Sequence, residues 1–210
     1  MKDINKFLES VKPRLVVKRP VFGVGINDLD HAVCSKINGK LFSHGCYLSW
    51  QQMLKRCYTK EYQRRFPSYV GCTVCPEWVR LSGFKKWWEL NYVDGYDLDK
   101  DLILPGNKIY SPETCVYIPS WLNKFTTFHD RARGEFPIGV DYSKSQGRFR
   151  ARVNHKDKGS IQIGYFDDPE SAHKAWLSAK LSIALEYKPI CDEIHPLIYD
   201  GIVKKIHSVI

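Results

Sequence analysis

Long apolar runs are missing from this sequence. No segment of its 210 residues approaches the ~20 consecutive apolar residues that a membrane-spanning helix needs. The first twenty residues also lack the apolar core and small-residue cleavage site of a secretory signal. Acidic residues are few beside basic ones, with 23 Asp and Glu against 32 Lys and Arg, a net charge of +9. We therefore expect a cytoplasmic protein with no membrane partner, and the positive charge favours a polyanionic partner.

Cysteine pairs with metal-binding spacing are scarce. Cys72 and Cys75 are separated by two residues, which is half of a common zinc pattern, but no second pair of that spacing exists. Cys46, Cys57 and Cys115 are the candidates for the other half. Packing of single thiols in a core explains these residues equally well and is our preferred interpretation, with Zn²⁺ a weakly supported cofactor. A cysteine nucleophile is disfavoured because no histidine partner is indicated.

Apolar residues are plentiful enough to build cores, at 43% hydrophobic and 13% aromatic. Their spacing predicts a helix over 47–58 and a second over about 76–91, which opens on a first-turn proline. Short strands and turns follow, and then a short helix over about 119–128. The tryptophans of the first two helices are more typical of a core than of stacking platforms for single-stranded nucleic acid.

The sequence of the last third of the chain predicts three strands followed by a helix. Glycine-containing polar loops separate the apolar-alternating segments, as in hairpins. The helix opens on an acidic turn with a proline near its start. The predicted strands are 138–142, 148–155 and 160–166, and the predicted helix is 167–188. A charged, glycine-containing stretch at 131–137 precedes them, and we place a domain boundary there.

Strand alternation puts Arg148, Arg150 and Arg152 on one face of the predicted sheet. The helix can cover the opposite, apolar face, so the arginine row points to water, with Gln162 beside it. A solvated face with charges for solubility is the alternative. Arginine bonds guanine edges and phosphates in a bidentate way, so in a chain of this charge we favour nucleic-acid binding.

The same segment carries a recognisable order of residues. IGVDYSKSQGRFRARV and then IQIGYFDDPESAHKAWLSAK resemble the plant ethylene-response-factor (apetala-type) DNA-binding domain, from Ile138 to about Lys188. The resemblance implies a sheet that enters the major groove of double-stranded DNA, with Arg148, Arg150 and Arg152 as contacts. It also departs from the family, because Gln162 stands where a tryptophan is usual.

Polar residues gather in the segment LDKDLILPGNKIYSPETCVYIPSWLNKF. Asp99 and Asp101 flank Lys100, and Asn123 comes from the following helix. Oxygen ligands of this kind suit Mg²⁺ or another divalent cation that activates water on a phosphodiester. The alternative is an ordinary hairpin with charged residues in solvent.

This segment resembles the beta-beta-alpha finger of HNH nucleases, in the phage and intron-encoded branch. KRCYTK, TVCPEW and YSPETC match elements of that branch, and the arginine-faced sheet downstream matches homing endonucleases with a C-terminal apetala-type domain. The resemblance implies Asp99, Lys100, Asp101 and Asn123 as catalytic positions, with Asp99, Asp101 and Asn123 holding the metal. Lys100 occupies the slot of the general-base histidine, and Thr114 replaces the asparagine that opens the second strand.

A lysine of ordinary pKa is protonated at neutral pH and cannot take a proton from water. The flanking aspartates should raise the pKa of Lys100 further. Three outcomes are open: Lys100 is desolvated enough to act as a base, which the aspartates argue against; a metal-bound hydroxide needs no protein base; or cleavage is lost. His129 could substitute for the base only if the chain folds back, and an exposed linker histidine is the commoner case.

Together these observations predict an α+β fold. Residues 1–130 form a helical and HNH-like domain with its finger at about 97–128, residues 137–190 form an apetala-type domain of three antiparallel strands on one helix, and 191–210 form a helical tail. The leading functional hypothesis is a phage or mobile-element DNA endonuclease, a hydrolase acting in the host cytoplasm. The second is a DNA-binding regulator or inhibitor with a dead nuclease finger. A zinc-stabilised protein-interaction module is the third, and no particular protein partner is indicated.

Overall fold

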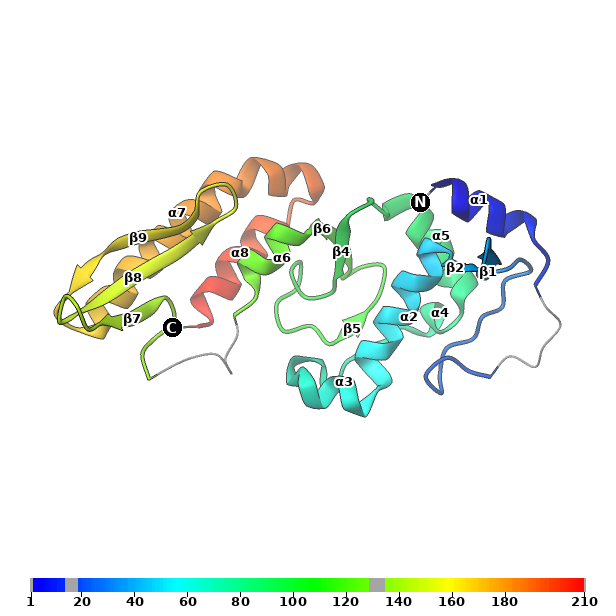
Figure 1. Ribbon diagram of the computed structural model, residues 1–210, viewed down its shortest axis with the longest axis horizontal. Helices are drawn as coiled ribbons and strands as arrows, with labels where there is room; N and C mark the ends of the chain where they lie inside the picture. The colour runs from blue at the N-terminus through cyan, green and yellow to red at the C-terminus, as the bar shows by residue number, and fades with distance from the viewer. Residues whose placement is uncertain (1, 14–18, 129–134, 210) are drawn as a thin grey trace. The chain divides into compact units, whose positions relative to one another are not determined.

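The computed structural model describes residues 2–13, 19–128 and 135–209 (Figure 1). Its elements are mixed α and β, with small separate sheets. The chain divides into two compact units. The N-terminal unit is Met1–Asp101 with Gly106–Tyr117, and the C-terminal unit is Leu102–Pro105 with Ile118–Ile210. The predicted α+β class is confirmed at this level, and no helix in the described ranges has the length and apolar character to cross a membrane.

The N-terminal unit is built on helices and two-stranded pairings. Its helices are α1 (Lys2–Ser10), α2 (Gly45–Tyr58), α3 (Lys60–Arg65), α4 (Pro76–Val79) and α5 (Leu81–Asn91), with a 3₁₀ turn η1 (Pro67–Tyr69). Its strands are β1 (Cys34–Ile37), β2 (Lys40–Ser43), β3 (Thr73–Val74), β4 (Tyr96–Asp99) and β5 (Ile109–Tyr110). β1 pairs with β2 antiparallel, and β3 pairs with β5 in parallel.

The predicted helix over 76–91 is wrong in one respect, because it is broken at Arg80. Arg80 has an extended backbone (φ −91°, ψ 132°) and forms a β-bridge with Ile26. The amide of Ile26 donates to the carbonyl of Val79, and the amide of Leu81 donates to the carbonyl of Ile26. A segment distant in the sequence thus takes the hydrogen bonds that a continuous helix would use.

The tryptophans of this unit belong to its core. Trp50 and Trp78 are fully buried, and the indole of Trp50 donates to the carbonyl of Trp78 at 2.6 Å. Trp88 stacks on Tyr92 with ring centroids 4.3 Å apart. The core interpretation is therefore confirmed for Trp50, Trp78 and Trp88, which leaves them unavailable as platforms for bases.

The C-terminal unit is a three-stranded antiparallel sheet with helices on one face. The sheet order is β7 (Val140–Ser143), β8 (Arg148–His155) and β9 (Gly159–Phe166). α7 (Pro169–Ile194) runs along the sheet, and α8 (Ile198–His207) packs on α7 and on α6 (Ser120–Thr126) (Figure 1). The three predicted strands and the helix are confirmed, although α7 continues six residues further than expected, past Pro189.

Local sequence explains the start of α7 and the turn before β7. The carboxylate of Asp168 caps α7 by accepting from the amide of Ser171 at 2.7 Å, with Pro169 in the first turn. Gly139 has φ +80°, and a Cβ there would lie 2.0 Å from the Trp176 ring. Only glycine therefore lets the chain enter β7 against the indole of α7.

The short helix α6 belongs to the C-terminal unit, whereas the sequence places the boundary after it, at 131–137. Trp121 and Phe125 of α6 pack edge-on against Tyr187 of α7, at centroid distances of 4.8 and 5.1 Å. β4 forms a sheet with β6 (Val116–Pro119), which leads into α6. The division between the units therefore falls inside the segment 97–128 that the sequence treats as one finger.

Candidate functional site

The arginine row of β8 lies on the solvent side of the sheet, as alternation predicts. Ala151 and Val153 between the arginines are buried, whereas the side chains of Arg148, Arg150 and Arg152 are 46%, 28% and 47% exposed. Three guanidinium groups therefore share one accessible surface.

Acidic side chains already contact these arginines. Arg150 donates from Nη2 to Oδ2 of Asp141 at 2.6 Å, and Arg152 donates from Nε to Oδ1 of the same carboxylate at 3.1 Å. Arg148 pairs with Asp167 at 2.9 Å. The hydrogen bond from Arg150 holds the pKa of Asp141 below its ordinary range despite partial burial, with further help from Arg152.

These ion pairs are exposed, so each is expected to contribute little to stability. The carboxylate of Asp141 is 36% exposed. Phosphate oxygens can compete for the same donors, because guanidinium groups bind phosphate as readily as carboxylate. The carboxylates orient the guanidinium planes, and an anion that binds more tightly can displace them.

A β-bulge adds an aromatic residue to this surface. Arg152 lies opposite Gln162, but Arg150 lies opposite Tyr165, so Ile163 is an extra residue between them. Cross-strand partners share a face, which places Tyr165 beside the arginines, and its phenol donates to Oε1 of Gln162 at 3.3 Å. Strict alternation along β9 would have assigned Tyr165 to the core face, so sequence reasoning missed it. The glycine at position 164 was the available signal, since an isolated glycine in a strand marks a bulge.

Lys100 is a buried, ion-paired cation. It is 6% exposed, and its Nζ donates to Oδ2 of Asp101 at 3.0 Å and to the carbonyl of Asn107 at 3.1 Å. Burial by itself lowers the pKa of Lys100, but Asp101, Cys72 and Asp99 together outweigh it, and the pKa lies above the ordinary value. Lys100 is therefore protonated at neutral pH and cannot act as a general base.

The acidic candidates lie beside Lys100. Asp99 ends β4, and its Oδ1 accepts from the amide of Asp101 at 2.9 Å. Asn123 lies on α6, in the other unit, where its carbonyl accepts from the hydroxyls of Thr126 and Thr127. The structure thus brings Asp99, Lys100 and Asp101 together in the N-terminal unit, and Asn123 belongs to the C-terminal unit. His129 lies outside the described residues.

The divalent cation that the HNH resemblance implies would have to share Asp99 and Asp101 with the partners that these carboxylates already have. Asp101 already neutralises a buried ammonium, and one oxygen of Asp99 is committed to a backbone amide. Within the described ranges, no group of three or more His, Cys, Asp or Glu side chains is placed to hold a metal ion. All seven cysteines are free thiols, and burial raises the pKa of Cys57 to about 12.

Comparisons with protein-family models, with curated proteins and with solved structures find no match to this chain.

Proposed function

We propose that the protein binds double-stranded DNA through the exposed face of the β7–β9 sheet. The observation that carries this proposal is the row of three accessible guanidinium groups on β8, flanked by Gln162 and Tyr165. Arginine provides charge for phosphates and a planar fork for guanine edges, and tyrosine adds a stacking and hydrogen-bonding surface. The net charge of +9 adds long-range attraction to a polyanion.

Salt dependence of binding tests this proposal. The triple variant Arg148→Ala, Arg150→Ala, Arg152→Ala is compared with a control that removes three exposed cations of the N-terminal unit, Lys60→Ala, Arg65→Ala, Lys86→Ala. Each lost phosphate contact lowers the slope of log K against log salt by about 0.9, so the sheet variant should lose about 2–3 units of slope. Equal slopes for the two triple variants in fluorescence anisotropy would place the DNA elsewhere.

Phosphodiester hydrolysis is the second candidate function. It is favoured by the order β4, β6, α6, in which Asp99 ends the first strand and Asn123 lies on the helix, as in the HNH finger. The protonated Lys100 argues against an HNH-type base, so the same segment also supports a DNA-binding protein whose finger does not cut.

Plasmid cleavage separates these two possibilities. Supercoiled plasmid is incubated with the protein and Mg²⁺ or Mn²⁺, and wild type is compared with Asp99→Ala, with Asn123→Ala and with the control Asp192→Ala. Nicking that both site variants abolish, and the control retains, would establish the endonuclease. Binding without cleavage in every preparation would establish the non-hydrolytic DNA-binding protein.

A further inference from the structure

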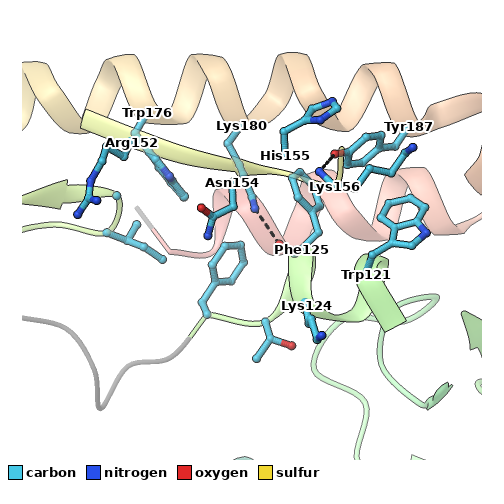
Figure 2. A pocket seen from close by; sticks show the side chains of 14 residues that line it. Trp121, Lys124, Phe125, Arg152, Asn154, His155, Lys156, Trp176, Lys180 and Tyr187 are labelled. Carbon is cyan, nitrogen blue, oxygen red and sulfur yellow. Dashed lines mark hydrogen bonds between the residues drawn. The ribbon is translucent and has the colours of Figure 1, made fainter. Parts of the chain in front are cut away.

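The C-terminal unit contains a cavity of about 530 Å³ between α6, β8 and α7 (Figure 2). This volume falls in the range of small-molecule sites. The cavity is separate from the arginine row over most of its wall, and Arg152 is common to both.

A buried lysine forms one side of this cavity. Lys180 is 6% exposed, and its Nζ donates to the carbonyl of Phe125 at 2.8 Å and lies 3.4 Å from the centroid of the Phe125 ring. An ammonium group has three hydrogen-bond donors. In the described part of the chain, that of Lys180 lies between a carbonyl and aromatic rings and has no anionic partner. Burial lowers the pKa of Lys180 to about 7.

The described lining is cationic. Four of its fourteen residues are Lys or Arg, and none is acidic. Two of the four have carboxylate partners, since Arg152 pairs with Asp141 and Lys156 pairs with Asp157. Lys124 and Lys180 have none among the described residues. An anion that entered would therefore meet two cations that the described residues do not neutralise.

Aromatic rings form much of the remaining wall. Trp121 and Phe128 are partly exposed, and Trp176 and Tyr187 are buried behind them. Figure 2 shows the labelled Trp121 at the end of the cavity that carries Lys124 and Lys156. The ammonium of Lys156 lies 5.6 Å from the centroid of the Trp121 ring. A flat aromatic group can stack on such rings.

We propose that this cavity binds a nucleotide, with its base against the rings of Trp121 and Phe128 and its phosphate directed to Lys180 and Lys124. A nucleotide combines a flat aromatic group with an anion, which are the two features that the wall complements. The anion would stabilise the charged form of a buried lysine for which the described residues provide no counterion. The nucleotide is either a free molecule or an unpaired residue of a nucleic-acid strand. Binding of the free nucleotide is independent of the proposed DNA binding by the sheet.

The first arm of the test uses free ligands and the full chain. Calorimetric titration with deoxyadenosine 5′-monophosphate should give saturable binding, and deoxyadenosine and inorganic phosphate should each bind at least about tenfold more weakly. Lys180→Met should weaken nucleotide binding about tenfold. Lys174→Met, an exposed lysine on the same helix, is the matched control and should change it less than twofold.

The second arm uses duplex DNA with a single-nucleotide bulge against the same duplex fully paired. A strand-borne nucleotide is indicated if the bulge tightens binding and Lys180→Met removes that preference. Loss of fully paired binding in the triple arginine variant reports separately on the proposed sheet interface.

Folding of the variants is checked by circular dichroism. If Lys180→Met is unfolded, the exposed Lys124→Ala takes its place and should weaken binding about threefold to fivefold. The proposal is overturned if the Lys180 and Lys124 substitutions reduce binding of the free nucleotide, and the preference for the bulge, no more than Lys174→Met does.

Discussion

Among the described residues, each unit buries one lysine to the same extent, and the two lysines are held in opposite ways. Lys100 and Lys180 are both 6% exposed. Against the effect of burial, Asp101, Cys72 and Asp99 together keep the pKa of Lys100 above its ordinary value, whereas burial lowers the pKa of Lys180 to about 7. Equal burial thus produces a permanent internal cation in one unit and a titrating amine in the other. The partner, and not the depth, decides the charge.

The largest expected effect is the loss of the paired lysine. Lys100→Met leaves Asp101 without its cation and the carbonyl of Asn107 without its donor. Because the Asp101 side chain is 30% exposed, solvent recovers part of the loss, and we expect destabilisation by about 2–4 kcal/mol. Urea unfolding followed by tryptophan fluorescence measures it, with the exposed Lys86→Met as control. Equal stability of the two variants would show that the Lys100–Asp101 pair contributes nothing.

Removal of Lys180, for which the described residues provide no carboxylate, should stabilise the protein instead. Lys180→Met replaces a buried ammonium by an apolar chain of similar length, at the cost of one hydrogen bond to the Phe125 carbonyl. We expect stabilisation by about 1–3 kcal/mol at pH 7. A thermal unfolding series with Lys174→Met beside it measures the difference, and a destabilised variant would mean that the hydrogen bond outweighs the burial of charge.

A pH series sharpens the same contrast. Between pH 7 and about 10 the unfolded chain keeps the Lys180 proton and the folded chain releases it, so stability should rise with pH. The slope contributed by one such group is at most about 1.4 kcal/mol per pH unit. The charged groups nearest the cavity, Lys124, Arg152, Lys156 and the His155–Glu186 pair, stay in place in Lys180→Met. Parallel stability curves for wild type and Lys180→Met would contradict the lowered pKa.

The smallest effect concerns the arginine row. Asp141→Asn frees Arg150 and Arg152 from a carboxylate, and we expect DNA affinity to rise about twofold to fivefold, in keeping with the weakness of exposed ion pairs. Asp192→Asn makes the same change of charge on α7 and should alter affinity less. Weaker binding by Asp141→Asn would show that the carboxylate is needed to orient the guanidinium groups.

The sequence predicted those elements whose signals are local. The strands of the C-terminal sheet are bounded by polar, glycine-containing turns, and α7 begins at an acidic cap followed by a proline. The break at Arg80 was not predictable from its neighbours, because the partner strand residue, Ile26, lies 54 positions earlier. Tyr165 was not identified because one extra residue in a strand reverses the alternation from that point on.

The candidate site was predictable only in part. The solvent-facing arginines follow from alternation, and the protonated state of Lys100 follows from its flanking aspartates. The burial of Lys180 was missed, although it lies four residues after Trp176 and seven before Tyr187, which is the spacing of one helix face. From the sequence alone, a lysine in that stripe is expected at the surface, because the packing of α6 against α7 is what buries it.

The turn at Gly139 is part of both the arginine-bearing sheet and the wall of the cavity. Its carbonyl accepts from the amide of Arg152 at 2.9 Å, and the residue also borders the cavity next to the Trp176 ring. In a scan of all single substitutions this position should tolerate no replacement, since any side chain would lift the first strand from the helix and reshape the cavity mouth together. A substitution at Gly139 would therefore disturb the arginine surface and the cavity at the same time, and the two could be altered separately only through other residues.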